Sequence, residues 1–411
     1  MNLPRRVAIS VVDQSLLSLL NFVIGIWLIR SASKYEYGLY LAGNAAVTYL
    51  LGIQAALVNV QMTVRAPLYQ GKERVHFCAA LVKAQLLFFS IPSLLFAGGA
   101  VVFTIGGGAY RDEMLLAGTV AMTFIGVLAR EFFRSYFFQE QNPLAVLIID
   151  IFYSIFLLCG LAVAVWTLHR DIHIAFLLTA GGASLIVGVV AARFAHLPSL
   201  REVHGIKTAV AEAWHGGRWA LAGMSVTWIQ DQSYIFLVGT IAGASATAEA
   251  GASRLFLAPA TLTLAGIFRV LMPRWAHMRQ SGEMMKVRSM TLRTAWVVAG
   301  IVAAYAVVAS VVQKKAIPIL FPGEYGNIGI LVIFWGIICD LQAARTAYST
   351  GLQVFERFRE ITIVNTYSAA IVLVSGYYLV HMYGVSGGMM AQVIGEFTLT
   401  GLLWRSVRNV V

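Results

Sequence analysis

Four of the acidic side chains inside long apolar runs of the sequence are candidate site residues, because a membrane would penalise an unpaired charge there by several kcal/mol. They are Asp13, Asp231, Asp340 and Glu396. Asp13 and Asp231 each open the tripeptide Asp-Gln-Ser, whose amide and hydroxyl oxygens could help a carboxylate hold a proton or Na⁺. The pattern predicts ion coupling or a polar lining of a central cleft. The alternative is that these groups make interhelical hydrogen bonds or ion pairs that only hold the helices together.

Four arginines in or beside the same runs carry the planar, multiply donating head group that suits phosphate. They are Arg30, Arg254, Arg269 and Arg345. We predict a cationic cleft in which these side chains bind a pyrophosphate. Salt bridges are the alternative, because Arg345 or Arg269 could instead neutralise Asp340, Asp150 or Asp231. Arg345 and Asp340 are close in sequence but do not face each other on one helix, so their partners are expected on other helices.

The composition explains why these charges matter. Charged residues make up 12% of the 411 residues, about half the usual share in a soluble domain, and hydrophobic residues make up 59%. The mean hydropathy is +0.76. These values exclude a water-soluble fold, a disordered chain and a disulfide-stapled domain. The apolar runs are continuous and about 20 residues long, which favours membrane-spanning helices over barrel strands.

We expect an all-α polytopic membrane protein with about twelve transmembrane helices in two pseudo-symmetric six-helix bundles. The expected spans are 7–29, 38–62, 77–104, 114–138, 144–168, 173–194, 219–243, 254–273, 294–313, 328–353, 361–381 and 385–404.

The two halves of the sequence look like copies of each other. The Asp-Gln-Ser tripeptide recurs in the first and seventh spans, and Glu36-Tyr37-Gly38 before the second span recurs as Glu249-Ala250-Gly251 before the eighth. We therefore predict an N-terminal bundle over 1–195, a cytoplasmic linker over 196–218 and a C-terminal bundle over 219–411. Because six is even, both bundles enter the membrane from the same side. Two such bundles favour a carrier that opens a central cleft to either side by rocking.

Most Lys and Arg residues fall on one side of the predicted spans. The positive-inside rule then places both termini in the cytoplasm. Arg130 and Arg134 are among the charges assigned to the cytoplasmic side. The net charge of +11 is explained by this topology and by anionic lipid, and it does not indicate nucleic acid.

No cofactor, metal site or catalytic constellation is expected. Cys78, Cys159 and Cys339 are far apart and form no CxxC pair, so they indicate neither a disulfide framework nor zinc. The predicted external segments are short turns without a cluster of acid and base residues. The sequence therefore favours a transport protein over an enzyme.

Three short motifs carry a resemblance to a known family. Arg30 is followed by Glu36-Tyr37-Gly38-Leu39-Tyr40, and the later motifs are Leu320-Phe321-Pro322-Gly323-Glu324-Tyr325 and Tyr383-Gly384-Val385-Ser386-Gly387-Gly388. With these motifs the chain resembles the bacterial polysaccharide-biosynthesis flippases, or oligosaccharide-lipid translocases. That family belongs to the multidrug/oligosaccharidyl-lipid/polysaccharide exporter superfamily.

The resemblance implies transfer of an undecaprenyl-pyrophosphate-linked oligosaccharide across the inner membrane for surface polysaccharide or exopolysaccharide biosynthesis. It also implies a cationic cleft between the bundles and transport driven by protons or Na⁺. The partners implied are a polysaccharide polymerase or export machinery. The chain departs from a fourteen-helix lipid II flippase because it lacks two C-terminal helices. Asp150 and Asp340 also depart from a uniformly cationic cleft.

Two other functions stay open at this stage. One is a multidrug or toxic-cation antiporter of the same superfamily, for which Asp13, Asp231 and Asp340 would supply an anionic cleft. The other is a membrane-embedded polysaccharide polymerase or ligase, which would need a larger external catalytic segment than the sequence offers.

Overall fold

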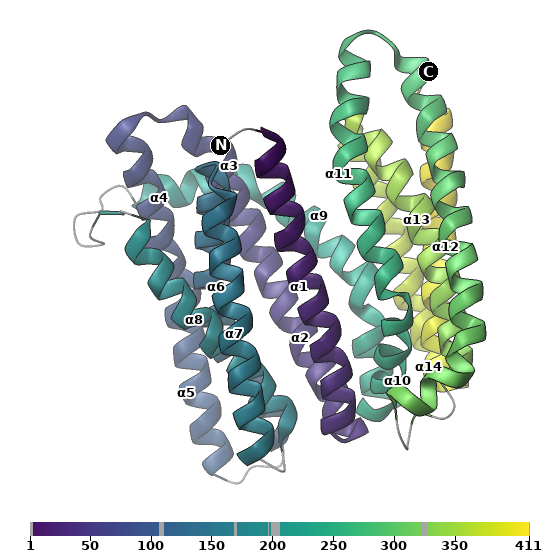
Figure 1. Cartoon of the computed structure of the whole chain (residues 1–411), viewed down its shortest axis with the longest axis horizontal. Coiled ribbons are helices and arrows are strands. Elements are labelled where there is room, and N and C mark those ends of the chain that lie inside the picture. Colours follow the sequence, from purple (N-terminus) through teal and green to yellow (C-terminus); the bar gives the residue numbers. More distant parts are fainter. Residues whose placement is uncertain are drawn as a thin grey trace. The chain divides into compact units, whose positions relative to one another are not determined.

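The computed structural model describes a chain that is almost entirely helical, with short turns between the helices and no strand among the described residues. Those residues are 3–106, 111–167, 171–195, 197–198, 206–321, 325 and 328–410. The helices that precede the predicted linker are α1 (Leu3–Ser31), α2 (Lys34–Gln54), η1 (Ala55–Asn59), α3 (Val60–Arg65), η2 (Ala66–Leu68), α4 (Gly71–Gln85), η3 (Leu86–Ser90), α5 (Ile91–Ile105), α6 (Arg111–Gln139), α7 (Pro143–Thr167) and α8 (Ile172–Phe194). The helices that follow are α9 (Ile206–Ile241), α10 (Ala244–Arg254), η4 (Leu255–Leu257), α11 (Ala258–Gln280), α12 (Met284–Leu320), α13 (Gly329–Val354) and α14 (Phe358–Arg408). Figure 1 traces them from purple to yellow.

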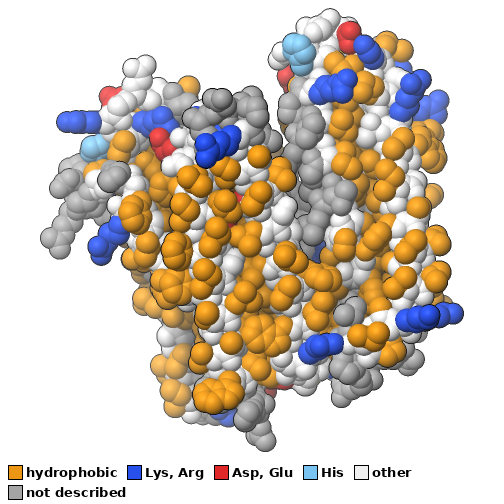
Figure 2. Space-filling view, in the orientation of Figure 1, with side chains coloured by type: hydrophobic (Ala, Val, Ile, Leu, Met, Phe, Trp, Pro, Cys, Tyr) orange, Lys and Arg blue, Asp and Glu red, His pale blue; other side chains and the backbone are white. Residues whose placement is uncertain are grey.

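The predicted membrane-spanning class is confirmed. Within the described ranges, nine helices are long and apolar enough to cross a bilayer. Large apolar side chains such as Val102 and Val311 are 72% and 68% exposed, which suits hydrocarbon and not water. On the face drawn in Figure 2, hydrophobic side chains cover the helices while Lys and Arg gather near helix ends. The chain is therefore a multi-pass membrane protein.

The long helix α14 holds two of the predicted spans. Its 51 residues contain a non-helical turn at Gly384, with φ 56° and ψ −134°. The Ser368 hydroxyl donates to the Gly395 carbonyl at 2.7 Å, so the arms on either side of Gly384 pack against each other. A positive φ is cheap only for glycine, which explains the residue at this turn. The helix count is thus consistent with about twelve spans, as expected.

Contacts divide the chain into two compact units. The first contains Met1–Asn21 and Ala42–Ser225, and the second contains Phe22–Leu41 and Val226–Val411. Each of α1, α2 and α9 therefore contributes residues to both units. The bundle limits 1–195, 196–218 and 219–411 follow sequence order and stay a prediction. Residues 196 and 199–205 of the predicted linker lie outside the described residues.

In the first unit, α6 and α8 approach each other at glycines. A Cβ built on Gly126 would lie 1.9 Å from the Gly181 carbonyl oxygen, far inside van der Waals contact. Small residues let membrane helices pack with their backbones this close. The sequence therefore positions α6, which carries the most charged part of this unit, directly against α8.

Gly126→Ala is expected to destabilise the protein by about 1–3 kcal/mol, because the new methyl group must push the two helices apart. Gly182→Ala is the matched control, since a Cβ there meets nothing within 4 Å. Thermal unfolding in detergent should show a lower Tm for Gly126→Ala alone. Equal Tm values for both variants would mean that α6 and α8 are not in close contact.

Candidate functional site

Arg134 of α6 is the centre of a buried charge cluster in the first unit. Its Nε donates to Asp150 Oδ2 on α7 at 2.7 Å, and its Nη2 donates to Asp13 Oδ2 on α1 at 3.4 Å. Its Nη1 donates to both oxygens of Glu131 at 3.0 Å. Asp13 is 2% exposed and Asp150 is 0% exposed. One guanidinium thus joins carboxylates from three helices.

A second arginine completes this Arg134 cluster. Arg130 Nη2 donates to Glu131 Oε1 at 3.0 Å, and its guanidinium lies 3.6 Å from the centre of the Tyr153 ring. The cluster therefore has three carboxylates for two arginines. Asp13 Oδ1 and Asp150 Oδ1 are buried without a hydrogen-bond partner. Because an orphaned buried acceptor is costly, the cluster has both the charge and the free oxygens to take one proton or small cation.

Arg345 of α13 is the centre of a similar cluster in the second unit. Its Nη1 donates to Asp231 Oδ1 on α9 at 3.1 Å and to Glu396 Oε1 on α14 at 3.0 Å. Gln342 Nε2 also donates to Glu396 Oε1 at 3.0 Å. The Glu396 side chain is fully buried and its Oε2 has no partner, whereas the Asp231 side chain is 28% exposed.

The Arg345 cluster has a second guanidinium close by. Arg254 of α10 lies 5.1 Å from the centre of the Trp335 ring and interacts electrostatically with Asp231. Arg345 therefore holds the ion pair with Asp231, and Arg254 is a second cation in the same neighbourhood. Asp231 is also more exposed than Glu396.

The two clusters repeat one arrangement. In each unit the aspartate of an Asp-Gln-Ser tripeptide, Asp13 or Asp231, pairs with an arginine from the fourth span of the predicted bundle, Arg134 or Arg345. The third group differs, because Asp150 comes from the fifth predicted span and Glu396 from the sixth within its half. This correspondence supports the internal repeat inferred from the sequence.

The remaining predicted residues are not gathered with these clusters. Arg30 is exposed and its Nη2 donates to the Ile319 carbonyl at the end of α12, where a cation complements the helix dipole. Asp340 Oδ1 is buried without a hydrogen-bond partner. The side chain of Arg269 lies outside the described part of the structure, as do residues 322–324 of the family-like motif. Of the four predicted arginines, Arg254 and Arg345 lie near a common carboxylate, Asp231.

The sequence analysis missed the centre of the first cluster. Arg130 and Arg134 were assigned to the cytoplasmic side, yet both side chains pair within α6 and its neighbours. The signal was present, because Arg130-Glu131 and Arg134 form charge pairs at helical spacing inside an apolar helix. Asp13, Arg134 and Asp150 also lie at similar distances from the predicted cytoplasmic ends of their spans, and therefore at similar depths in the membrane.

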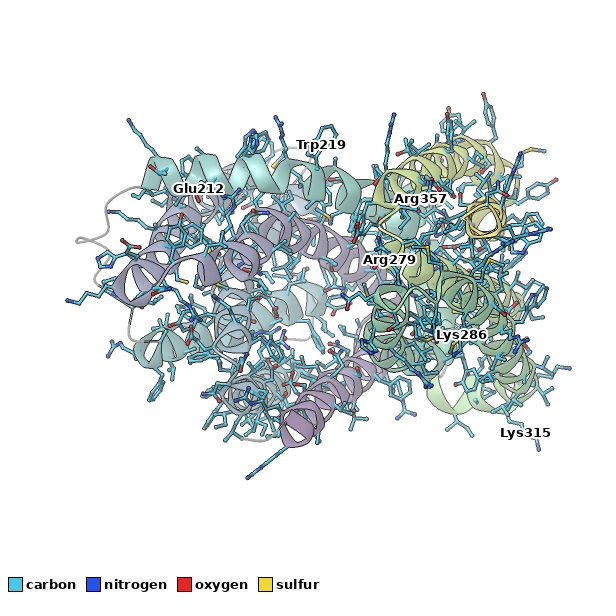
Figure 3. The ribbon with its side chains drawn as sticks, turned by 90° about the horizontal axis from the view of Figure 1, so that it is seen from above. Glu212, Trp219, Arg279, Lys286, Lys315 and Arg357 are labelled. Carbon is cyan, nitrogen blue, oxygen red and sulfur yellow. The ribbon has the colours of Figure 1, made fainter. Side chains whose placement is uncertain are left out.

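Charge pairs at helix ends are separate from the clusters. Arg279 and Arg357, labelled in Figure 3, lie near the ends of α11 and α14, where Arg279 Nη1 donates to the Val354 carbonyl at 2.6 Å and Arg357 pairs with Glu360. Lys34 likewise pairs with Glu249. Partly exposed pairs of this kind contribute little to stability.

Glu212, also labelled in Figure 3, joins the start of α9 to the segment around Arg65 and Tyr69, outside the predicted spans. Its Oε2 accepts hydrogen bonds from Arg65 Nη1 and from the Tyr69 hydroxyl, both at 3.2 Å. Partial burial and the Glu212 carboxylate raise the pKa of Tyr69. The Tyr69 hydroxyl therefore stays protonated as the donor of this bond.

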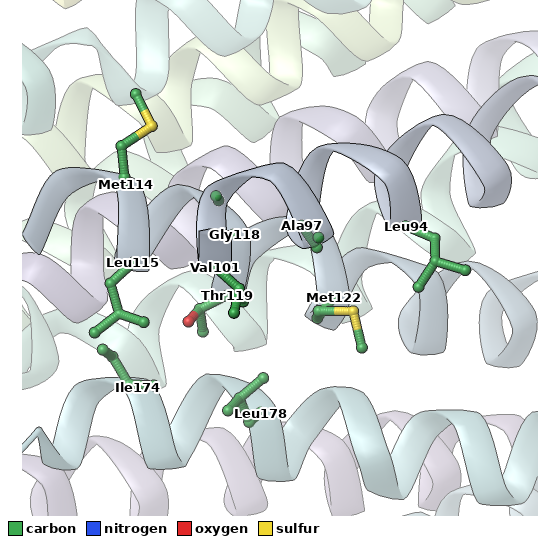
Figure 4. A pocket seen from close by; sticks show the side chains of 12 residues that line it. Leu94, Ala97, Val101, Met114, Leu115, Gly118, Thr119, Met122, Ile174 and Leu178 are labelled. Atoms are coloured by element: carbon green, nitrogen blue, oxygen red, sulfur yellow. The ribbon is translucent and has the colours of Figure 1, made fainter. Parts of the chain in front are cut away.

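An apolar cavity of the first unit is also distinct from the charged clusters. Its volume is about 390 Å³, and α5, α6 and α8 line it with side chains such as Leu94, Val101, Met122 and Leu178 (Figure 4). Thr119 supplies the only side-chain hydroxyl among the lining residues. The cavity offers contacts to hydrocarbon and holds no charge for a head group.

Comparison with known proteins shows which solved structures share the fold of this chain. No protein-family model matches the sequence, and no curated protein matches it significantly. Among solved structures, it is similar to the lipid II flippase MurJ in an inward closed conformation, with a TM-score of 0.76 at 12% identity over 96% of this chain and 87% of that one. It is also similar to an inward-facing multidrug resistance MATE family transporter of the MOP superfamily, with a TM-score of 0.70 at 13% identity over 96% and 94% of the chains.

A third similar structure is a MOP superfamily transporter from Pyrococcus furiosus, described as having a binding pocket of reversed polarity. Its TM-score is 0.64 at 12% identity over 98% of this chain and 93% of that one. The chain thus has the fold of MOP superfamily transporters. Identities this low establish the fold alone, so the substrate must be argued from the chain's own residues.

Proposed function

We propose that the protein is an inner-membrane flippase that translocates a polyprenyl-pyrophosphate-linked oligosaccharide for surface polysaccharide or exopolysaccharide biosynthesis. The observation that carries this proposal is the arrangement around Asp231, which is ion-paired with Arg345 at 3.1 Å and interacts electrostatically with Arg254. Two guanidiniums held near one partly exposed carboxylate form a site that a diphosphate can enter by displacing that carboxylate. The family-like motifs and the fold shared with a lipid II flippase support the same substrate class.

The mechanism we propose is an exchange of counter-ions during alternating access. A pyrophosphate takes the place of Asp231 on Arg254 and Arg345, with Arg30 and Arg269 as further cationic contacts along its route. The released Asp231 is left without its cation and binds a proton or Na⁺, which couples substrate binding to ion binding. Glu396 and Asp340 belong to the same coupling set in the second unit, and Asp13 with Asp150 in the first.

A cation antiporter is the second candidate, and the Arg134 cluster favours it. That cluster has one more carboxylate than arginine and two orphaned carboxylate oxygens, Asp13 Oδ1 and Asp150 Oδ1. A lipophilic cation or a proton would complete it. In the flippase proposal the same surplus serves the coupling ion, whereas in the antiporter it would serve the substrate as well.

Deletion of the gene tests the proposed substrate class. Export of surface polysaccharide should be lost in a strain without a redundant carrier and restored by the wild-type gene. Arg254→Ala and Arg345→Ala should each restore less export than wild type at equal membrane levels, because each removes one of the two proposed diphosphate donors. Unchanged export together with increased sensitivity to cationic drugs would favour the antiporter instead.

A further inference from the structure

Two neighbouring spans of the first unit are interrupted by π-helical turns. The segment η1 follows α2, where the Val60 N–H donates to the Ala55 carbonyl, and η3 follows α4, where the Ile91 N–H donates to the Leu86 carbonyl. Each turn holds one residue more than an α-helical turn. π-turns are rare, are found mostly at functional positions, and locally loosen the regular hydrogen-bond ladder.

A buried pair of glutamines stands directly before the two π-turns. Gln54 Nε2 donates to Gln85 Oε1 and to the Leu128 carbonyl of α6, both at 2.9 Å, and Gln85 Nε2 donates to the same carbonyl at 3.3 Å. Gln54 is fully buried and Gln85 is 4% exposed. These bonds tie three helices together at one level. We call Gln54, Gln85 and the Leu128 carbonyl the glutamine clasp.

The two π-turns bound one continuous piece of chain. Between them lie α3, η2 and α4, so residues 60–85 form a short helical hairpin that joins the rest of the unit through η1 at one end and η3 at the other. A loosened turn at each end is what a segment needs in order to pivot as a body. Two π-turns in unrelated places would not have this consequence.

The first half of α9 packs against the same hairpin. A Cβ built on Gly216 would overlap the Gln61 side chain of α3, and the Arg65–Glu212 ion pair joins α3 to α9 at 3.2 Å. The clasp is also close to the Arg134 cluster, because Leu128 and Arg134 lie on α6 about 9 Å apart along the helix axis. A change of charge in the cluster therefore acts on the helix that anchors the clasp.

We propose that residues 60–85 form a pivoting hairpin whose hinges are η1 and η3 and whose latch is the glutamine clasp. The hairpin carries the start of α9 with it through Glu212 and Gly216. This inference concerns motion within the first unit and does not depend on the substrate. It adds to the proposed function a place where the fold can bend while the surrounding helices α6, α7 and α8 stay intact.

Hydrogen–deuterium exchange on the full-length protein in lipid nanodiscs tests the hinge. In the wild type, amides of 55–59 and 86–90 should exchange about tenfold faster than those of 146–150 in the uninterrupted helix α7, because their hydrogen bonds are weaker. Equal exchange in the three segments would overturn the proposal without any variant. A transport assay is not involved, so this failure would leave the flippase proposal standing.

Gln54→Met and Gln85→Met test the latch, since methionine keeps the length of the side chain and loses the amide. Either variant should raise exchange in both π-turns by about tenfold, because the clasp couples them. Gln392→Met is the matched control, since Gln392 is equally buried and its Nε2 donates to the Gln230 carbonyl at 2.7 Å in a helix without a π-turn. If Gln85→Met loosens only η3, or if Gln392→Met loosens η1 and η3 equally, the clasp is not a latch.

Discussion

Replacing Arg134 with glutamine is expected to cost about 3–5 kcal/mol of folding free energy, because removal of one partner leaves buried charges uncompensated. The effect should be large because Asp13, Glu131 and Asp150 all pair with this one guanidinium, although Glu131 also pairs with Arg130. The measurement is thermal unfolding of the detergent-solubilised protein. The fraction that still elutes as a monodisperse peak after heating is recorded at each temperature and gives the Tm.

Two further variants test whether the loss of stability comes from unbalanced buried charge in the Arg134 cluster. Arg359→Gln is the control, because Arg359 is exposed and lies outside the cluster, and it should leave Tm unchanged. Arg134→Gln combined with Asp150→Asn should recover much of the lost stability, since it removes one buried negative charge with the positive one. A wild-type Tm for Arg134→Gln alone would contradict the assignment of Arg134 as the shared counter-ion.

Arg345→Gln combined with Glu396→Gln is expected to fold but to lose transport. The pair of changes removes one positive and one negative charge, so the buried charge balance of the Arg345 cluster is kept. The diphosphate loses a charged donor that contributes about 1.5–3 kcal/mol, which corresponds to roughly a tenfold to hundredfold drop in transport at low substrate. The measurements are Tm and transport of a polyprenyl-pyrophosphate-linked sugar in the same preparation.

Single variants complete this test. Arg345→Gln alone should lose both stability and transport, because it leaves Glu396 buried without its cation. Glu396→Gln alone should keep the diphosphate site but lose its dependence on the ion gradient. If the double variant transports like wild type, Arg345 is a structural counter-ion and the proposed substrate site is wrong.

The sequence predicted the architecture well because membrane spans leave a strong signal. Long apolar runs were sufficient to expect the helices, including the two arms of α14, which were expected as the spans 361–381 and 385–404. The spans could be expected because, in a bilayer, each backbone must satisfy its own hydrogen bonds. Residues 22–41 belong to the second compact unit although they lie near the start of the chain. This assignment could not be expected, since it depends on contacts between helices distant in sequence.

The candidate site was predicted only in part, for a physical reason. Asp13 and Asp231 were conspicuous because a repeated polar tripeptide is rare in an apolar run. Arg134 was not, since a cation near the end of a span is normally read as an interface anchor. Which arginine binds which carboxylate depends on helix rotation and depth, and the sequence specifies neither closely enough to place Arg134 beside Asp150.

The central claim is that the Arg254–Arg345 pair carries a lipid-linked diphosphate across the membrane. Its most direct test is translocation of a fluorescent polyprenyl-pyrophosphate-linked oligosaccharide in proteoliposomes, measured by loss of signal to an impermeant quencher. The account predicts fast translocation by wild type, at most about a tenth of that rate for Arg345→Gln/Glu396→Gln, and normal rates for Arg359→Gln. Translocation by the double variant at the wild-type rate, or none by the folded wild-type protein in an imposed proton or Na⁺ gradient, would contradict it.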